Sequence, residues 1–216
     1  MTTTAGRPVM RVGAVLVAAA LLLGGCGGDE DDKPAPKPAP SQPAVTTRTT
    51  VDHVTGRLKP KARKAIIARA GKLVDGWFDA AYVGGDYPRK ATSFTSAFPG
   101  FTGGAVAAAR KNLKLMSNAD IGARISGVQP LSKGVRLDVL AMKGWPVGVT
   151  ARIWLSYRTS GQLVSKQLVR GQLDLTKVKG TWKVFAFTVT KTRRPLGGSG
   201  TGKSPSSGSS SKGASS

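Results

Sequence analysis

The sequence offers little sulfur or imidazole chemistry. Its 216 residues include one Cys, Cys26, and one His, His53. A single Cys cannot form an intramolecular disulfide, and one Cys with one His cannot complete a zinc site built from these ligands. We therefore expect no metal site and no cofactor.

Acidic residues are also scarce. The chain has 11 Asp and Glu against 33 Lys and Arg, a formal net charge of +22. Four of the acids, including the only Glu, lie together in residues 29–32. Residues 51–195 hold seven Asp and no Glu, which makes a hydrolase with a carboxylate pair unexpected.

No hydrophobic run is long enough to span a membrane. The longest, residues 12–23, has twelve apolar or small residues and follows a segment that carries Arg7 and Arg11 without an acid. A run of this length suits the core of a signal peptide, whereas a spanning helix needs about 20 residues. We expect no transmembrane helix after processing.

The end of this run, Leu23-Gly24-Gly25-Cys26, resembles the lipobox of bacterial lipoproteins. The resemblance implies cleavage between Gly25 and Cys26, and attachment of a diacylglycerol and a further acyl chain such as palmitate to Cys26. Two or more acyl chains hold a protein stably on a membrane. The implied location is the extracellular face of the cytoplasmic membrane. The alternative is an ordinary secretory signal with a stray Cys.

Composition divides the chain into four parts. Residues 1–25 form the signal peptide, and residues 26–50 form the lipidated Cys with an acidic, Pro-rich linker. Alternating prolines favour a polyproline II spacer, about 75 Å long for 24 residues at ~3.1 Å each. Residues 51–195 are predicted to form one α+β domain. Residues 196–216 are a Gly- and Ser-rich tail predicted to be disordered.

Helices are predicted in the first half of the domain. Residues 60–83 carry an apolar stripe at spacings of three and four, and Gly84-Gly85 ends the helix. A short helix is expected within residues 91–98. Another is expected over residues 102–117, with Thr102 as its N-cap.

The second half alternates apolar and polar residues, which indicates strands. A bulge is expected at Gly171 and a tight turn at Lys179-Gly180. Helices followed by a run of strands indicate α+β architecture with an antiparallel sheet. The expected strands are residues 123–131, 135–141, 149–157, 162–175 and 181–192.

This order of elements resembles the nuclear transport factor 2-like, or cystatin-like, fold. The last hairpin, with Gly180, Trp182 and Val184, resembles the Gly-x-Trp-x-Val ending common in that family. Such domains follow a lipobox in exported proteins of GC-rich Gram-positive bacteria. The resemblance implies N-terminal helices packed on a curved antiparallel sheet that encloses a conical cavity.

Eight residues are candidates for lining that cavity. Asp86 and Tyr87, an acid beside a phenol, are expected near its mouth and would serve a cyclase- or isomerase-like enzyme. The alternative for Asp86 is a turn former. The other six would line an apolar pocket or serve as ordinary core: Trp77, Phe78, Tyr82, Phe94, Phe98 and Trp154.

Other polar residues have simpler interpretations. Asp75 and Asp79 are expected on a solvated helix face, and His53 in the linker. Asp138 is expected to pair with Arg136 or Arg152 across the sheet. With Cys26 acylated and His53 in a linker, neither a Ser-His-Asp nor a Cys-His catalytic arrangement is expected. Trp145, between two glycines, is either an exposed contact point or packed over the sheet end.

The domain is strongly basic. Residues 51–195 hold 26 Lys and Arg against seven acids, densest in residues 57–64 and 191–194. Export makes nucleic acid an improbable partner, which leaves membrane headgroups, anionic envelope polymers or an envelope protein. The sequence predicts a non-catalytic, membrane-anchored envelope lipoprotein that binds or scaffolds through this domain. The alternatives are a carrier of a small apolar or lipid ligand in the cavity and, third, the cyclase-like enzyme.

Overall fold

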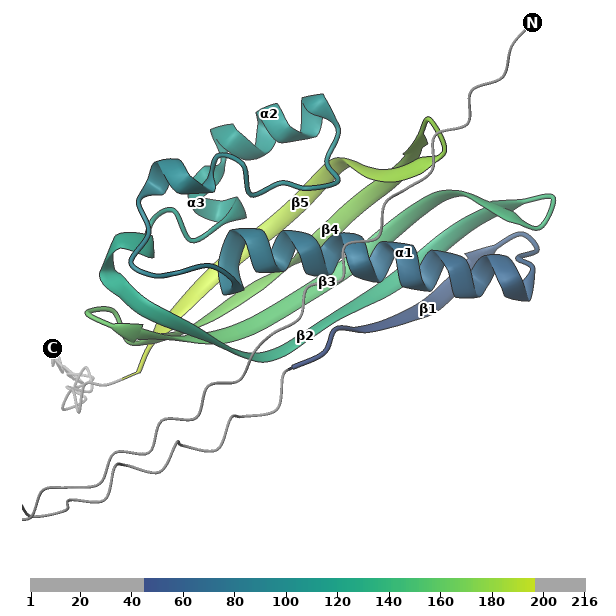
Figure 1. The fold of residues 1–216 in the computed structure, drawn as a ribbon. Helices are drawn as coiled ribbons and strands as arrows, with labels where there is room; N and C mark the ends of the chain where they lie inside the picture. Colours follow the sequence, from purple (N-terminus) through teal and green to yellow (C-terminus); the bar gives the residue numbers. More distant parts are fainter. Residues whose placement is uncertain (1–44, 197–216) are drawn as a thin grey trace, which may run out of the picture. The chain divides into compact units, whose positions relative to one another are not determined.

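A five-stranded sheet forms the frame of the domain (Figure 1). The computed structural model describes residues 45–196, so the predicted signal peptide, Cys26, most of the linker and the tail lie outside the described residues. The strands lie in chain order, and every pair except the first is antiparallel. Their bounds are β1 Arg48–Thr55, β2 Ile125–Met142, β3 Trp145–Gly161, β4 Ser165–Val178 and β5 Thr181–Pro195.

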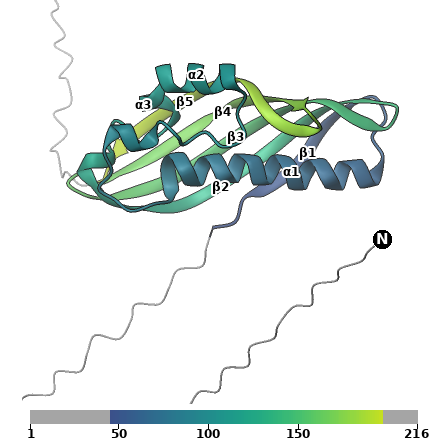
Figure 2. The same ribbon diagram turned by 45° about the horizontal axis from the view of Figure 1, so that its top comes forward.

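The helices cover one face of this sheet (Figures 1 and 2). The longest, α1 (Pro60–Phe78), runs along the sheet and continues into the π-helical turn η1 (Asp79–Val83). Thr102 caps α2 (Gly103–Lys111) as predicted, because its hydroxyl accepts a hydrogen bond from the Ala105 N–H. Short helices complete the layer: η2 Ala91–Phe94, α3 Leu113–Met116 and η3 Gly122–Arg124. The predicted α+β class with helices packed on a sheet is confirmed.

The predicted helices and strands are found within residues 58–192, but the sequence did not predict β1, which lies before them. The sequence predicts that residues 48–50 and His53 lie in the linker before the first helix, whereas all of them belong to this strand. β1 pairs parallel to β2, so the sheet is not wholly antiparallel. The segment is polar, and only its β-branched Thr and Val residues indicate a strand.

β2 joins two predicted strands into one. Its pairing with β3 shifts between Pro130 and Ser132, which accommodates a residue without an N–H donor. Two residues after Ser132 lies Gly134, where a Cβ atom would stand 2.1 Å from the Trp154 ring.

The prediction of a bulge at Gly171 is wrong, because the pairing of this residue with both neighbouring strands is regular. Gly171 instead permits close approach of β5, since a Cβ there would lie 2.1 Å from the Thr188 carbonyl oxygen.

The core lies between α1 and the sheet face beneath it. Ile66, Ala70 and Val74 are buried against alternate residues of the central strands, such as Leu137 and Leu155. Each large apolar side chain buried in this way stabilises the fold by about 1.5–3 kcal/mol. Within residues 45–196, no helix is long and apolar enough to cross a membrane.

Candidate functional site: a groove beside α1

The predicted cavity-lining aromatics fill the interior. Trp77, Phe78, Tyr82 and Phe94 are fully buried, and Phe98 is 5% exposed. The Trp77 ring centroid lies 5.2 Å from Phe78 and 5.6 Å from Tyr82, which is normal spacing for packed aromatic pairs. These five residues therefore belong to the core, the alternative that the sequence had left open.

Trp154 lies on the opposite face of the sheet. Its outward register follows from its position between the inward residues Ile153 and Leu155. The ring covers Gly134, and the Arg136 guanidinium lies 5.7 Å from its centroid. The expectation that Trp154 joins the other aromatics is wrong, because its place in the alternating strand directs it away from the helices.

Asp86 and Tyr87 do not form an acid–phenol pair. Asp86 is exposed, whereas the Tyr87 hydroxyl donates to the Tyr82 carbonyl at 2.9 Å. Burial raises the pKa of Tyr87, against the opposing effects of Asn118 and Arg89. The two groups that the cyclase-like alternative would use are therefore divided between solvent and the partly buried hydroxyl of Tyr87.

A buried polar cluster around Asn118 closes this end of the core. The Tyr157 hydroxyl donates to Asn118 Oδ1 at 2.5 Å, and Asn118 Nδ2 donates to the Tyr82 carbonyl at 2.8 Å and to the Tyr87 hydroxyl at 3.2 Å. Burial raises the pKa of Tyr82 and Tyr157 well above the usual value, so both remain neutral. Sequence reasoning missed this cluster because Asn118 follows a helix, where a turn role is expected.

The charged residues also differ from expectation. Asp75 is not simply solvated, because its carboxylate accepts hydrogen bonds from Lys133 and Thr47, both at 2.5 Å. Burial alone would raise the pKa of Asp75, but these contacts outweigh it and hold the pKa below 3.8. Burial raises the pKa of Asp79, opposed by the charge of Lys133. The predicted pairing of Asp138 with Arg152 is confirmed at 2.8 Å.

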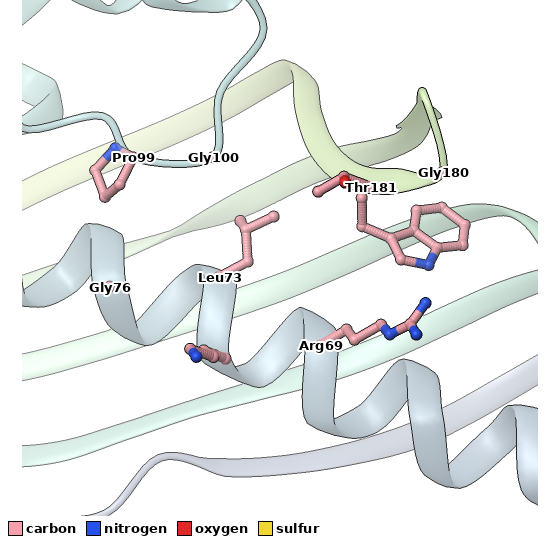
Figure 3. Close-up of a pocket in the computed structure, with 9 residues that line it drawn as sticks. Arg69, Leu73, Gly76, Pro99, Gly100, Gly180 and Thr181 are labelled. Atoms are coloured by element: carbon pink, nitrogen blue, oxygen red, sulfur yellow. The ribbon is translucent and has the colours of Figure 1, made fainter. Parts of the chain in front are cut away.

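An open groove runs along the other side of α1. It consists of two neighbouring hollows of about 530 and 220 Å³ that share Arg69 and Trp182. Figure 3 shows the larger hollow between α1, the loop at Pro99-Gly100 and the β4–β5 turn. We call this the α1 groove. Its lining residues are Lys61, Ala62, Ala65, Ile66, Arg69, Lys72, Leu73, Gly76, Pro99, Gly100, Trp145, Pro146, Lys177, Gly180, Thr181 and Trp182.

Backbone contacts fix the loop that forms one wall. The Val184 N–H donates to the Gly100 carbonyl at 3.0 Å, and the Thr102 N–H donates to the Val184 carbonyl at 2.9 Å. Gly100 has a φ of 77°, and a Cβ there would lie 3.1 Å from Leu73. Across the groove, Gly76 leaves room beside Pro99, since a Cβ would lie 3.9 Å from that ring.

The groove has an apolar floor and a basic rim. Trp182, 5% exposed, lies at the junction of the two hollows, with Leu73 and Pro99 farther along. The cations Lys61, Arg69, Lys72 and Lys177 lie around these residues, and the lining contains no acid.

Arg69 and Lys72 are exposed and make no ion pair within residues 45–196. Such a site suits a ligand that has an apolar body and an anionic group.

The groove was not predicted from the sequence. The helical spacing of residues 60–83 puts Arg69 and Lys72 on the polar side of the helix, which indicates only a solvated face, and the sequence identifies Trp182 only as part of the last hairpin. A large aromatic at an inward strand position beside a turn was the one available signal.

Within residues 45–196, no group of three or more His, Cys, Asp or Glu side chains is placed so that it could hold a metal ion.

Comparisons of this chain with protein-family models, curated proteins and solved structures found no match.

Proposed function

We propose that this protein is a non-catalytic, lipid-anchored protein of the cell envelope that binds an amphipathic anion in the α1 groove. The observation that carries the proposal is the combination of an apolar floor with a rim of four cations and no acid. It favours a carrier of a small lipid-like ligand over a purely scaffolding role. An anionic envelope polymer or an envelope protein would use the same cations but not the floor.

The dimensions and chemistry of the groove support this ligand class. Ligand pockets commonly have volumes of about 300–1,000 Å³, and the larger hollow lies in this range. An acyl chain would lie against Leu73 and Trp182. Its carboxylate or phosphate would meet Arg69, whose planar guanidinium suits such groups.

The lipobox resemblance at Leu23–Cys26 supports the location. Acylation at Cys26 and cleavage after Gly25 would leave the protein on the extracellular face of the cytoplasmic membrane. The order of helices and strands supports a nuclear transport factor 2-like fold, although the parallel strand β1 departs from the expected pattern. The non-catalytic role is supported by the separation of Asp86 from the Tyr87 hydroxyl.

Ligand binding can be tested with oleate and its uncharged analogue oleyl alcohol. Calorimetric titration of the full chain is expected to show tighter binding of oleate, because only oleate carries a charge for the basic rim. Arg69→Glu with Lys72→Glu should weaken oleate binding at least about tenfold, a change of ~1.4 kcal/mol, and leave oleyl alcohol binding nearly unchanged. Lys90→Glu with Lys111→Glu, which changes two exposed lysines outside the groove, is the matched control. Equal effects of the two double variants would contradict the proposal.

The anchor can be tested independently by metabolic labelling. Cys26→Ala should prevent acylation, because it removes the only thiol in the chain. Metabolic labelling with palmitate should be lost in this variant. Continued labelling would exclude Cys26 as the acylation site, whatever the result for the groove.

A further inference from the structure

Exposed apolar side chains gather at one end of the domain. Seven large hydrophobic residues are exposed within the described part of the chain, and six belong to the β2–β3 and β4–β5 hairpins near their turns. Met142 is 61% exposed and Trp145 49%. The seventh, Val164, lies beside the β3–β4 turn. We call the first six the apolar tip: Leu140, Met142, Trp145, Val147, Val178 and Phe185.

Several contacts bring the turns of this end together. The Lys59 N–H donates to the Gly144 carbonyl at 3.1 Å, which joins the segment before α1 to the β2–β3 turn. Trp145 and Lys177 line the same hollow, which links the β2–β3 hairpin to the β4–β5 hairpin. Leu140 and Phe185 line another hollow, farther from the turns, together with Asp138 and Asp174.

The two turns of the tip and the adjoining start of α1 are rich in cations. Residues 55–64, 140–147 and 176–183 together hold nine Lys and Arg and no acid. The Lys59 ammonium lies 5.5 Å from the centre of the Trp145 ring, so cation and aromatic are adjacent. Within residues 45–196, none of these nine cations makes an ion pair.

Two of the lysines occupy unfavourable backbone positions. Lys143 and Lys179 have φ values of 51° and 49°, and they are the only non-glycine residues with positive φ in the described part. Each is the first residue of a two-residue Lys-Gly hairpin turn, a position where Asn is usual. A lysine at the extreme point of both hairpins costs conformational energy that asparagine would reduce, which points to a role for the charge.

We propose that the apolar tip inserts into the headgroup region of an anionic phospholipid membrane. Exposed apolar residues beside Lys are typical of surfaces that lie in the membrane interface, where Trp is also favoured. Clustered Lys and Arg attract anionic lipids. A water-soluble anionic polymer would account for the cations but not for Leu140, Met142 and Val147, and this favours lipid.

This contact would be additional to the acyl anchor, and it goes beyond the proposed function because it does not require a ligand in the groove. Since Trp145 lies at the tip and also lines the α1 groove, one end of the groove would face the lipid surface.

Insertion can be measured with an environment-sensitive fluorophore on the full chain carrying Cys26→Ser. The label is placed at Met142→Cys or, as the matched control, at Val164→Cys, an exposed apolar residue outside the tip. With vesicles that contain phosphatidylglycerol, we expect a blue shift and several-fold brightening at position 142 and little change at position 164. Vesicles of phosphatidylcholine alone should give a much weaker response. Because both labelled chains retain residues 1–25, binding through that segment affects them equally.

The lysines provide a second, fold-preserving test. Lys143→Asn with Lys179→Asn suits the backbone better and removes two charges from the tip. It should raise the phosphatidylglycerol concentration needed for half-maximal brightening by about 30-fold. Lys166→Asn with Arg194→Asn, at a cross-strand pair outside the tip, should have a smaller effect.

Brightening at both labelled positions would overturn the proposal, and so would an unchanged label at position 142. A soluble polyanion serves as a competitor. If it prevents vesicle binding when added first but does not dim a label that has already inserted, the result supports lipid as the partner of the tip. If the polyanion binds the tip and the vesicles do not, the proposal is refuted. Oleate binding is measured without vesicles, so the groove and the tip can fail separately.

Discussion

The two ends of the domain differ in which groups they bury: one end buries polar side chains, and the other exposes apolar ones. At the end closed by Asn118, Tyr82 and Tyr157 are buried, Tyr87 is partly buried, and the hydroxyls of all three are hydrogen-bonded. Lys191 there is largely buried and donates to the Ser117 carbonyl at 2.7 Å and to Asp120 at 2.6 Å. At the apolar tip, hydrophobic side chains are exposed and cations lack acidic partners.

This difference shows that the net charge alone does not locate a binding surface. Lys191 belongs to one of the two densest basic runs in the sequence, yet its ammonium is used within the fold. Burial lowers the pKa of Lys191, and the contact with Asp120 partly offsets this effect. In the other basic run, residues 57–64 at the tip, Arg63 donates to the Val51 carbonyl, but none of the cations pairs with an acid within residues 45–196. The useful signal is therefore a cation without an acidic partner.

Breaking the closed end should have the largest effect. Asn118→Ala leaves the Tyr157 hydroxyl and the Tyr82 carbonyl with fewer partners in a buried site, so we expect the free energy of unfolding to fall by about 3 kcal/mol. Urea denaturation measures this loss. Asn112→Ala, which removes one exposed hydrogen bond to Ala108, is the control and should cost less than about 1 kcal/mol. Similar losses in both variants would show that the Asn118 cluster does not stabilise this end.

Filling the groove should separate binding from stability. Gly76→Met places a side chain beside Pro99 and should reduce oleate affinity at least about tenfold, which is ~1.4 kcal/mol. Because glycine is a poor helix former, stability should stay level or rise by about 0.5–1 kcal/mol. Ala68→Met, at an exposed position of α1 outside the groove, is the matched control. Unchanged oleate affinity in Gly76→Met would place the ligand elsewhere.

Lys133 connects α1 to the sheet, and its contribution should depend on pH. Lys133→Met removes the ion-pair partner of Asp75, leaves its hydrogen bond from Thr47, and should lower stability by on the order of 1 kcal/mol at neutral pH. The folded pKa of Asp75 is lowered from the unfolded value of 3.8, so the stabilisation is present above pH 3.8 and is lost as the pH falls from there through the folded pKa. Wild type and variant should therefore begin to converge in acid denaturation as the pH falls below about 3.8. A constant difference down to pH 2 would rule out the ion pair as its source.

The smallest expected effect concerns the backbone of the tip. Lys143→Asn should raise the free energy of unfolding by a few tenths of a kcal/mol, because Asn tolerates a φ of 51° better than Lys. Thermal unfolding can detect this gain. Lys166→Asn, on the regular strand β4, should give no gain. Destabilisation by Lys143→Asn would mean that the lysine supports the turn, and the argument from strain would fail.

Patterns within one element could be predicted from the sequence, whereas contacts between distant segments could not. The α1 stripe, the Thr102 cap and the Lys179-Gly180 turn depend on neighbouring residues and were correctly predicted. β1 depends on pairing with residues more than 80 positions away, and its own sequence is polar.

The α1 groove could not be predicted for the same reason, since four separate segments form its walls. Trp145 shows an intermediate case. Its position between two glycines indicated a strand junction, but only the structure shows that half of its surface is exposed.

The parallel pairing of β1 has a mechanical consequence. The chain enters the described domain just before β1, where Thr47 is bonded to Asp75, and the Arg63 guanidinium holds the Val51 carbonyl at 3.0 Å. Tension on the chain from its N-terminal side would act along the strand. The evenly spaced hydrogen bonds to β2 would then share the load in shear rather than open one at a time. Force applied from the N-terminal side would therefore be resisted at β1, the strand where it enters the domain.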